Sequence, residues 1–386
     1  MILLQIIFFL SLLGIVYSYF LYPLVLLVRN KWCASFALQM SSDSDQADIP
    51  KMSLIITAHN EQARMAEKLE NSLAIEYPKG CLEIIVASDC STDSTDSIVL
   101  GYADKGVQLV RSNEHNGKEY AQKLAIDASS GDILVFSDAG TKIPVEALEL
   151  IAEKFSDERV GAVSSEDRFL TDDGEVVGEG AYVRYEMWLR GLETKAGGLV
   201  GLSGSFFAAR RLVCTDNWDT KADSDFNTAL NCGRLGLVAV SSDDVLGYYR
   251  DVKNPEQEYF RKVRTVLRGI TGLARQSGVL NPFAFGFFSF KVFSHKLMRW
   301  AVPWFMLLAL VSNAVLLGEG LFYQLVFACQ MAAYVVVALA WKIEALRENT
   351  LIKLGFFFVQ VNIAIADATV RFLKGERMVT WKPSER

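Results

Sequence analysis

The chain has 386 residues, of which 51% are hydrophobic, and its formal net charge is −6. This acidic balance argues against general affinity for nucleic acid, because binding to phosphate backbones depends on an excess of Lys and Arg. The six cysteines form no CxxC pair and show no metal-ligand spacing, so we expect free thiols in a reducing compartment. The length allows one large domain or two moderate ones.

The first segment of the chain is apolar enough to anchor it in a membrane. Residues 2–28 carry no charged side chain and are long enough to cross a hydrocarbon core of about 30 Å. They lack the basic start, the shorter apolar stretch and the small-residue cleavage site of a secretory signal. We therefore expect an uncleaved transmembrane helix over residues 1–30, followed by a polar linker over residues 31–52.

Apolar runs of strand length then alternate with helical patterns. The expected strands are 53–58, 82–88, 107–111, 132–137, 160–164, 205–209 and 236–240, and the expected helices are about 61–75, 94–103, 117–129, 144–155, 180–195 and 224–232. Continuous apolar strands bounded by turns are typical of a parallel sheet that is buried on both faces. The pattern therefore predicts an α/β domain over residues 53–255, with a mostly parallel, Rossmann-like sheet and helices on both faces.

The remainder of the chain is again membrane-related. Residues 256–298 space basic residues among apolar and aromatic ones at helical intervals, which predicts amphipathic helices at a membrane surface. Apolar segments near 300–318, 321–341 and 354–372 predict C-terminal transmembrane helices within residues 299–374, followed by a tail over 375–386.

Basic residues near the spans predict the orientation of the α/β domain. Arg29 and Lys31 follow the first span, and Lys296 and Arg299 precede the second, which places the α/β domain in the cytoplasm. A complete fourth crossing would put the Lys- and Arg-rich tail outside, against the same rule. Either segment 354–372 is re-entrant or interfacial, or the tail is an exception.

Two expected strands end in an aspartate that is followed by a turn. The run "LEIIVASDCSTDST" reaches Asp89, and "GDILVFSDAG" reaches Asp138. Open α/β sheets bind ligands at the carboxyl ends of their strands, and an aspartate there can hold a divalent cation against phosphate oxygens. Lys118, at the start of another expected helix, adds positive charge. The sequence therefore predicts a nucleotide and metal site, although Asp89 could be only a helix cap, Asp138 a turn former and Lys118 a surface lysine.

Residues 53–270 resemble the glycosyltransferase family 2 enzymes, which have a GT-A fold. The motifs that carry this resemblance occur in the family's order: "LIITAHNE", "IIVASDCSTDST", "DILVFSDAG", "VGLSGSFFAARR", "SDFNTALNCGRLG" and "EYFRKVRTVLRG". The later segments "SHKLMRWAVP" and "FLKGERMVTWKPSER" resemble the membrane-attached branch that makes extracellular polysaccharides. The resemblance implies an exopolysaccharide-synthase-like enzyme, integral to the inner membrane of a bacterium.

The resemblance also implies roles for individual residues. Those implied to bind the nucleotide-sugar are Thr57, Ala58, Glu61, Asp89, Lys118, Asp138, Arg264 and Arg268. Asp138 would also bind Mg²⁺ or Mn²⁺ at the diphosphate, while Gly204 and Ser205 would face the acceptor. Asp225 would be the general base, and Asp223, two residues earlier, is its rival for that role.

The chain departs from the family pattern in two places. The DxD segment reads Asp138-Ala139-Gly140, so its last carboxylate is missing and metal binding would depend on Asp138, the diphosphate and water. The QxxRW motif of processive synthases reads Thr265-Val-Leu-Arg268-Gly269, which keeps only the arginine. Addition of one sugar to a lipid-linked acceptor is therefore at least as well supported as polymerisation through a self-formed channel.

We therefore expect an inverting transferase that moves a sugar from a UDP-sugar to a lipid-linked saccharide or a growing exopolysaccharide. Membrane lipids and other polysaccharide-assembly proteins would be its partners. Two alternatives stay open. One is a transferase whose acceptor is a polyprenyl phosphate, which needs no strong base. The other is a non-catalytic, nucleotide-binding subunit of a polysaccharide synthase complex, which the incomplete DxD segment favours.

Overall fold

The computed structural model describes residues 1–386 except 34–35, 39–48, 171–180, 251–254 and 379–386, so parts of the predicted linker and tail lie outside the described residues. The chain divides into two compact units. The first unit contains Met1–Val25, Asn254–Ile270 and Phe290–Arg377, and the second contains Leu26–Lys253, Thr271–Ser289 and Met378–Arg386.

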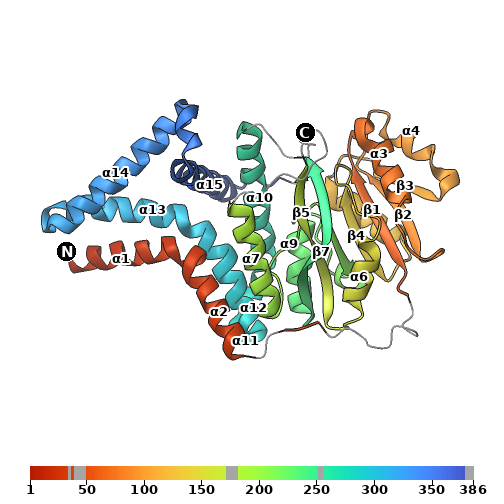
Figure 1. Ribbon diagram of the computed structural model, residues 1–386, viewed down its shortest axis with the longest axis horizontal. Coiled ribbons are helices and arrows are strands. Elements are labelled where there is room, and N and C mark those ends of the chain that lie inside the picture. Colours follow the sequence, from red (N-terminus) through yellow and green to blue (C-terminus); the bar gives the residue numbers. More distant parts are fainter. Residues whose placement is uncertain (34–35, 39–48, 171–180, 251–254, 379–386) are drawn as a thin grey trace. The chain divides into compact units, whose positions relative to one another are not determined.

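The second unit is built on a seven-stranded sheet, counted over the described residues (Figure 1). In sheet order the strands are β3 (Val107–Arg111), β2 (Leu82–Ser88), β1 (Met52–Ala58), β4 (Ile133–Asp138), β6 (Phe206–Arg210), β5 (Val160–Leu170) and β7 (Val238–Arg250). Strand β1 runs parallel to β2 and β4, β2 runs parallel to β3, and β5 runs parallel to β7. Among the strands of the described residues, β6 is the one that is antiparallel to both of its neighbours. The predicted mostly parallel sheet is confirmed.

Helices cover both faces of this sheet. They are α3 (Gln62–Leu73), α4 (Thr95–Leu100), α5 (Lys118–Ala128), α6 (Ala147–Phe155), α7 (Ala181–Lys195), α8 (Arg211–Cys214) and α9 (Ser224–Arg234). All seven residues of β1 are buried. Its Leu54 belongs to one apolar cluster with Met65 of α3, and the next residue, Ile55, belongs to another with Ala125 of α5. Alternate side chains thus fill two cores, which explains why the centre of the strand, Leu54 to Ile56, is apolar on both faces.

Gly131, just before β4, lies too close to β1 for a side chain. Its amide donates to Ser53 Oγ at 2.9 Å, and a Cβ atom would lie 2.6 Å from the backbone nitrogen of Ser53. Gly131→Ala should therefore cost about 1–3 kcal/mol, because backbone cannot yield as a side chain can. This should lower the thermal midpoint of unfolding by several degrees, roughly 2–4 °C per kcal/mol. Gly191→Ala, in α7 where a Cβ meets nothing within 4 Å, is the control and should be neutral or stabilising.

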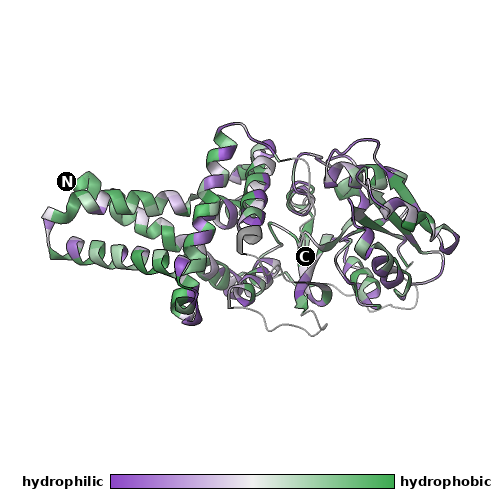
Figure 2. Ribbon diagram, turned by 90° about the horizontal axis from the view of Figure 1, so that it is seen from above, coloured by the Kyte–Doolittle hydropathy of each residue, from purple (hydrophilic) through white to green (hydrophobic). Residues whose placement is uncertain are grey.

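The first unit consists of long apolar helices. Helical stretches Ile2–Trp32, Phe287–Glu319, Leu321–Lys342 and Thr350–Leu373 are long and apolar enough to cross a membrane, which makes four among the described residues. Figure 2 shows that the helices beside the N-terminus are coloured mainly as hydrophobic. Helix α14 (Leu321–Lys342) and helix α15 (Thr350–Leu373) match the predicted third and fourth segments.

The second long stretch begins earlier than the predicted segment near 300–318. Helix α12 (Phe287–Val292), a π-helical turn (Phe293–Leu297) and α13 (Met298–Val315) follow one another without a break. The helix continues through its basic residues, of which Lys291 is 1% exposed and His295 is 7% exposed. Helix α10 (Pro255–Arg275) occupies the first part of the predicted interface segment. The domain boundaries themselves stay predictions.

Close contacts tie the helices of the first unit together. A Cβ on Gly14, in α1 (Ile2–Val16), would lie 2.5 Å from the ring of Phe305 in α13, so the glycine permits this approach. The hydroxyl groups of Tyr17 and Ser294 are 2.9 Å apart. In α15, Asp367 pairs with Arg371 at 2.9 Å, which compensates the charge within an otherwise apolar helix.

Candidate active site

The carboxyl ends of β1, β2 and β4 bring the first two predicted aspartates to one edge of the sheet. Strand β1 lies between β2 and β4, with Ala58 paired to Ser88 and Thr57 paired to Asp138. The amide of Asp89 donates to the carbonyl of Ala58 at 2.9 Å. Parallel strands deliver their carboxyl ends to the same edge, so this geometry is what the sequence pattern predicted.

Asp89 is fully buried and holds the loop that precedes α5. Its Oδ1 accepts from the amide of Asn116 at 3.0 Å, and its Oδ2 accepts from the amide of Gly117 at 2.9 Å. His115 Nδ1 lies 2.9 Å from the same Oδ2. Two backbone donors therefore compensate the buried carboxylate and fix the backbone next to Lys118, with the imidazole ring of His115 beside them. Contact of Asp89 with a nucleotide stays a prediction.

Lys118 contacts both Asp138 and the loop that contains Gly204. Its Nζ lies 2.5 Å from Asp138 Oδ1 and donates to the carbonyl of Gly204 at 3.0 Å. Burial opposes the charged form of the lysine, but the carboxylates of Asp138, Glu119 and Asp225 outweigh it and raise the pKa of Lys118 above its ordinary value. Lys118 is therefore a permanent cation at the centre of an acidic site.

Asp225 approaches the same point from the other half of the sheet. It lies in the first turn of α9, where the helix dipole favours a negative charge. A Cβ on Gly204 would be only 3.3 Å from Asp225 Oδ2, so the carboxylate lies against the loop whose carbonyl binds Lys118. The structure thus brings Asp89, Asp138 and Asp225 together, although they are far apart in the chain.

The other predicted nucleotide-binding residues are held by contacts within the fold. Thr57 Oγ1 accepts from Gln122 Nε2 at 3.1 Å. Glu61 Oε2 pairs with Arg64 Nη1 at 3.1 Å, and its backbone amide donates to Thr95 Oγ1 at 2.8 Å. These contacts place Thr57 and Glu61 at the edge of the sheet. Their contact with a nucleotide-sugar stays a prediction.

The predicted arginines belong to the first unit. Arg264 and Arg268 lie on α10, and Arg268 is 6% exposed. Gly269, which stands where processive synthases carry tryptophan, lies against the ring of Trp300, 3.0 Å from the position of a Cβ. The predicted contact of either arginine with a diphosphate stays a prediction.

Lys68 is a buried amine next to Asp138 that the sequence analysis missed. Its Nζ donates to Ser137 Oγ at 2.7 Å and to the carbonyl of Thr141 at 2.6 Å, on either side of Asp138. Burial lowers the pKa of Lys68 to about 7, against a smaller raising effect of Asp138. A signal was present in the sequence, because Lys68 follows Met65 by three residues and therefore lies on the apolar face of α3.

Stability should depend on pH through Lys68. The unfolded chain keeps this proton up to the ordinary pKa of 10.5, whereas the folded protein loses it near pH 7. The unfolded state therefore binds more protons between these values, and the free energy of unfolding should rise with pH there, by up to about 1.4 kcal/mol per pH unit. The thermal midpoint of wild type minus that of Lys68→Met should increase from pH 7 to pH 9.

The control for this measurement is Lys105→Met. Lys105 is an exposed lysine, 3.0 Å from Glu70, on the same domain. The thermal midpoint of wild type minus that of Lys105→Met should not change between pH 7 and pH 9. A flat difference for Lys68→Met as well would contradict the assignment of a buried, neutral amine to Lys68.

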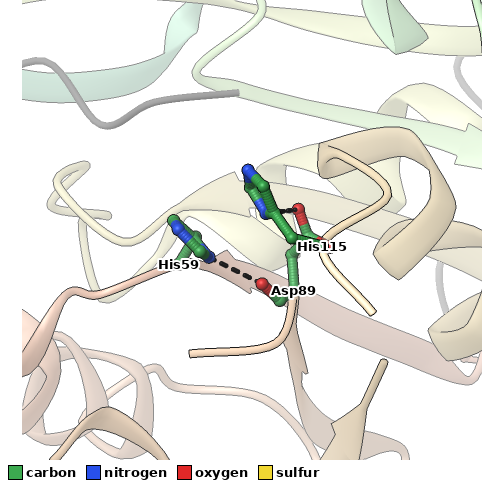
Figure 3. Close-up of side chains that lie close together, drawn as sticks. All are labelled: His59, Asp89 and His115. Carbon is green, nitrogen blue, oxygen red and sulfur yellow. Dashed lines mark hydrogen bonds and ion pairs between the residues drawn. The ribbon is translucent and has the colours of Figure 1, made fainter. Parts of the chain in front are cut away.

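One group of side chains could offer three ligand atoms to a metal ion. His59, Asp89 and His115 have ligand atoms within 4.8 Å of one another, and Figure 3 shows the two rings beside the aspartate. The imidazole rings are stacked with their centroids 4.0 Å apart, and His59 Nδ1 lies 2.6 Å from the carbonyl oxygen of Asp89. His59 Nδ1 and Asp89 Oδ2 already have partners within the fold, so a cation bound through these atoms would have to displace those contacts.

Asp138 fits a metal ion that arrives with a substrate. Its side chain is 23% exposed, and it is the one carboxylate of the predicted DxD segment. Mg²⁺ is commonly held by one or two protein carboxylates together with substrate phosphates and water. The ammonium group of Lys118 already lies 2.5 Å from the same carboxylate, so any cation at Asp138 competes with it.

Comparison with known proteins agrees with the motifs. Residues 53–214 match the family Glycosyl transferase family 2. The beta-monoglucosyldiacylglycerol synthase of Nostoc sp. is 28% identical over 193 residues, which cover 47% of this chain and 40% of that protein. The poly-beta-1,6-N-acetyl-D-glucosamine synthase of Staphylococcus aureus is 26% identical over 192 residues, which cover 48% of this chain and 46% of that protein. These alignments thus span less than half the length of the curated relatives.

A solved structure shares the fold over almost the whole chain. The mannosyltransferase PcManGT from Pyrobaculum calidifontis, in complex with GDP-Man and Mn²⁺, superposes with a TM-score of 0.73 at 21% identity, covering 97% of this chain and 100% of that one. The similarity of fold agrees with the mostly parallel sheet and its helices. The resemblance noted from the motifs is confirmed: residues 53–214 form a glycosyltransferase family 2 domain with a GT-A fold.

Proposed function

We propose that the chain is an inverting, membrane-bound glycosyltransferase that moves a sugar from a UDP-sugar to a lipid-linked saccharide or a growing exopolysaccharide. The observation that carries the proposal is the connection from Asp138 through Lys118 to Gly204 and Asp225, at the sheet edge that Asp89 organises. The family 2 domain supports glycosyl transfer. The names of the two curated relatives support a lipid or a polysaccharide as the acceptor.

The arrangement of charges suits a single displacement at the anomeric carbon of the donor. Asp225 takes the proton of the acceptor hydroxyl as that oxygen bonds to the anomeric carbon. The bond from this carbon to the diphosphate oxygen breaks, the oxygen keeps the electron pair, and the nucleoside diphosphate leaves. The ammonium group of Lys118 stabilises the charge that develops on the leaving group. Because the acceptor attacks opposite the leaving group, the anomeric configuration inverts, and one base suffices.

Asp138 is the residue that would hold Mg²⁺ or Mn²⁺ together with the donor's phosphates. When bound, the ion would supply positive charge against the diphosphate. The complex of PcManGT with Mn²⁺ supports a metal in this fold. The lone carboxylate and its pairing with Lys118 favour weak binding of the free ion, which strengthens only with the donor present.

The location of the enzyme is part of the same proposal. Four apolar helices support integral membrane attachment, and Arg29 with Lys31 at the end of the first supports a cytoplasmic α/β domain in a bacterial inner membrane. A nucleotide-sugar donor is a cytoplasmic metabolite, so the proposed orientation gives the site access to its donor.

The test is a donor screen with the purified full-length protein in nanodiscs. UDP-glucose, UDP-N-acetylglucosamine and UDP-galactose would be compared with GDP-mannose, which is included because PcManGT is complexed with GDP-Man. Each donor is supplied with a bacterial lipid extract and with Mg²⁺, Mn²⁺ or EDTA. We expect lipid-dependent release of UDP and a product whose anomeric configuration, measured by NMR, is inverted.

Two other outcomes would contradict parts of the proposal. Release of GDP alone would replace the UDP-sugar by a GDP-sugar. Binding of a nucleotide without release from any donor would favour the non-catalytic subunit instead.

A further inference from the structure

A carboxylate outside the predicted site anchors the loop that carries Gly204. Asp167 lies in β5, and its Oδ1 accepts from Ser203 Oγ at 2.6 Å and from Ser205 Oγ at 2.7 Å. The two serine hydroxyl groups are themselves 2.9 Å apart. One carboxylate oxygen thus accepts a hydrogen bond from the residue on each side of Gly204. Hydrogen bonds to an ionised acceptor are about twice as strong as neutral ones.

Neighbouring groups support the same loop from beneath. The amide of Ser203 donates to Ser164 Oγ at 2.7 Å, and Arg190 Nη2 of α7 donates to the same hydroxyl. Ser203 is 3% exposed and Ser164 is fully buried. The loop is therefore attached to two residues of β5, Ser164 and Asp167. Asp167 binds the residues on both sides of Gly204.

The loop in turn contacts every charged group of the proposed chemistry except Asp89. The carbonyl of Gly204 accepts from Lys118 Nζ, and the carbonyl of Ser205 accepts from the amide of Asp138 at 3.0 Å. Asp225 Oδ2 lies against Gly204. A shift of this loop would therefore move Lys118 and the space in front of Asp225 together.

We propose that Asp167 is a positioning residue for sugar transfer, which holds the Ser203–Ser205 loop so that Lys118 and Asp225 keep their relative geometry. This inference rests on the proposed function. Asp167 touches neither the donor nor the acceptor, and its effect passes through two serine hydroxyl groups. Misplacement of a reacting group by about 1 Å can cost about 10²-fold in rate.

The test compares four variants of the full-length protein in the transfer assay. Asp167→Ala should lower kcat for transfer by about 10- to 100-fold, with a smaller effect on the Kd of the donor nucleotide, because Lys118 keeps its second partner, Asp138. Asp167→Asn keeps an acceptor oxygen for the serines and should restore most of kcat. The Ser203→Ala/Ser205→Ala double variant should match Asp167→Ala, and adding Asp167→Ala to it should change little, because the three side chains act as one unit.

The matched control is Asp244→Ala. Asp244, in β7, also accepts from one serine hydroxyl, that of Ser242, and it pairs with Lys154 at 2.7 Å. Its loss should lower stability without lowering transfer per folded molecule. Equal loss of transfer in Asp244→Ala and Asp167→Ala would overturn the inference, as would wild-type kcat in Asp167→Ala.

A second measurement separates this inference from the proposed function. Hydrogen–deuterium exchange at the amides of residues 203–205 should accelerate in Asp167→Ala and stay near wild type in Asp167→Asn and Asp244→Ala. Unchanged exchange in Asp167→Ala would overturn the positioning role whether or not transfer is observed. Accelerated exchange in a protein that transfers from no donor would leave the loop contact standing and remove the proposed function instead.

Discussion

Asp225→Asn should lower kcat for sugar transfer by about 10²- to 10⁴-fold, the range that a positioned general base contributes. The amide is almost the same size as the carboxylate, so its contact with the Gly204 loop should persist. It cannot accept the proton of the acceptor hydroxyl. The Kd of the donor nucleotide should therefore stay close to the wild-type value. The measurement is single-turnover transfer from the labelled donor, with nucleotide affinity determined separately by calorimetry.

Asp223→Asn is the control for this prediction, because Asp223 stands directly before α9 and is the rival for the same role. It should keep transfer within about threefold of wild type, because Asp223 precedes the first turn of α9, where Asp225 lies against the Gly204 loop. Loss of transfer in Asp223→Asn but not in Asp225→Asn would reverse the assignment. Near-normal transfer in both variants would instead favour a phosphate acceptor, which needs no strong base.

Asp89→Asn should weaken binding of the donor nucleotide by roughly tenfold or more. The wild-type carboxylate accepts from two backbone amides and lies beside His115. An amide side chain would turn its NH₂ group toward one of these donors, and a buried donor without a partner costs about 1–3 kcal/mol. The loop before α5 should loosen, and Lys118 would lose its fixed position. Calorimetric titration with the nucleoside diphosphate measures the effect.

The matched control for Asp89→Asn is Asp96→Asn. Asp96 lies in α4, behind the same strand end, and pairs with Arg111 at 2.6 Å while accepting from Ser88 Oγ at 2.5 Å. Asp96 makes no contact with the loop before α5 among its described hydrogen bonds and ion pairs. The affinity of the Asp96→Asn protein for the nucleotide should therefore stay within about threefold of wild type. Equal affinities of Asp89→Asn and wild type would show that the loop does not depend on the carboxylate.

The sheet could be predicted because its central strands have apolar runs bounded by turns. Strands 82–88 and 107–111 agree with the observed bounds, although only 84–88 is continuously buried and 107–111 lies at the edge of the sheet. The predicted strands 160–164 and 236–240 end earlier than the observed β5 and β7. These strands continue as a parallel pair to Leu170 and Arg250, where the side chains of β5 are only half-buried. Hydrogen bonds between the two backbones extend these strands beyond their apolar residues. No pattern within either segment of the sequence predicts this pairing.

The site could be predicted where chemistry follows a strand end, and not where it depends on a distant partner. Asp89 and Asp138 end apolar runs, so their meeting at one edge follows from the parallel sheet. The position of Lys68 on the apolar face of α3 favours burial, but the sequence around Lys68 and Asp167 does not identify their partner side chains. Their partners are 69 and 36 residues or more away, at Ser137 and Ser203, so only the folded chain reveals them.

One edge of the sheet is proposed to bind the nucleotide, the diphosphate with its metal ion and the acceptor hydroxyl group that Asp225 deprotonates. A structure of the full-length protein with the released nucleoside diphosphate bound tests this proposal most directly. We expect the diphosphate to contact Lys118 Nζ and to be joined to Asp138 through a divalent cation, with the nucleobase beside the loop that Asp89 holds and Asp225 facing the vacated sugar position. A nucleotide bound away from these carboxylates, with the Lys118–Asp138 pair unchanged at 2.5 Å, would contradict it.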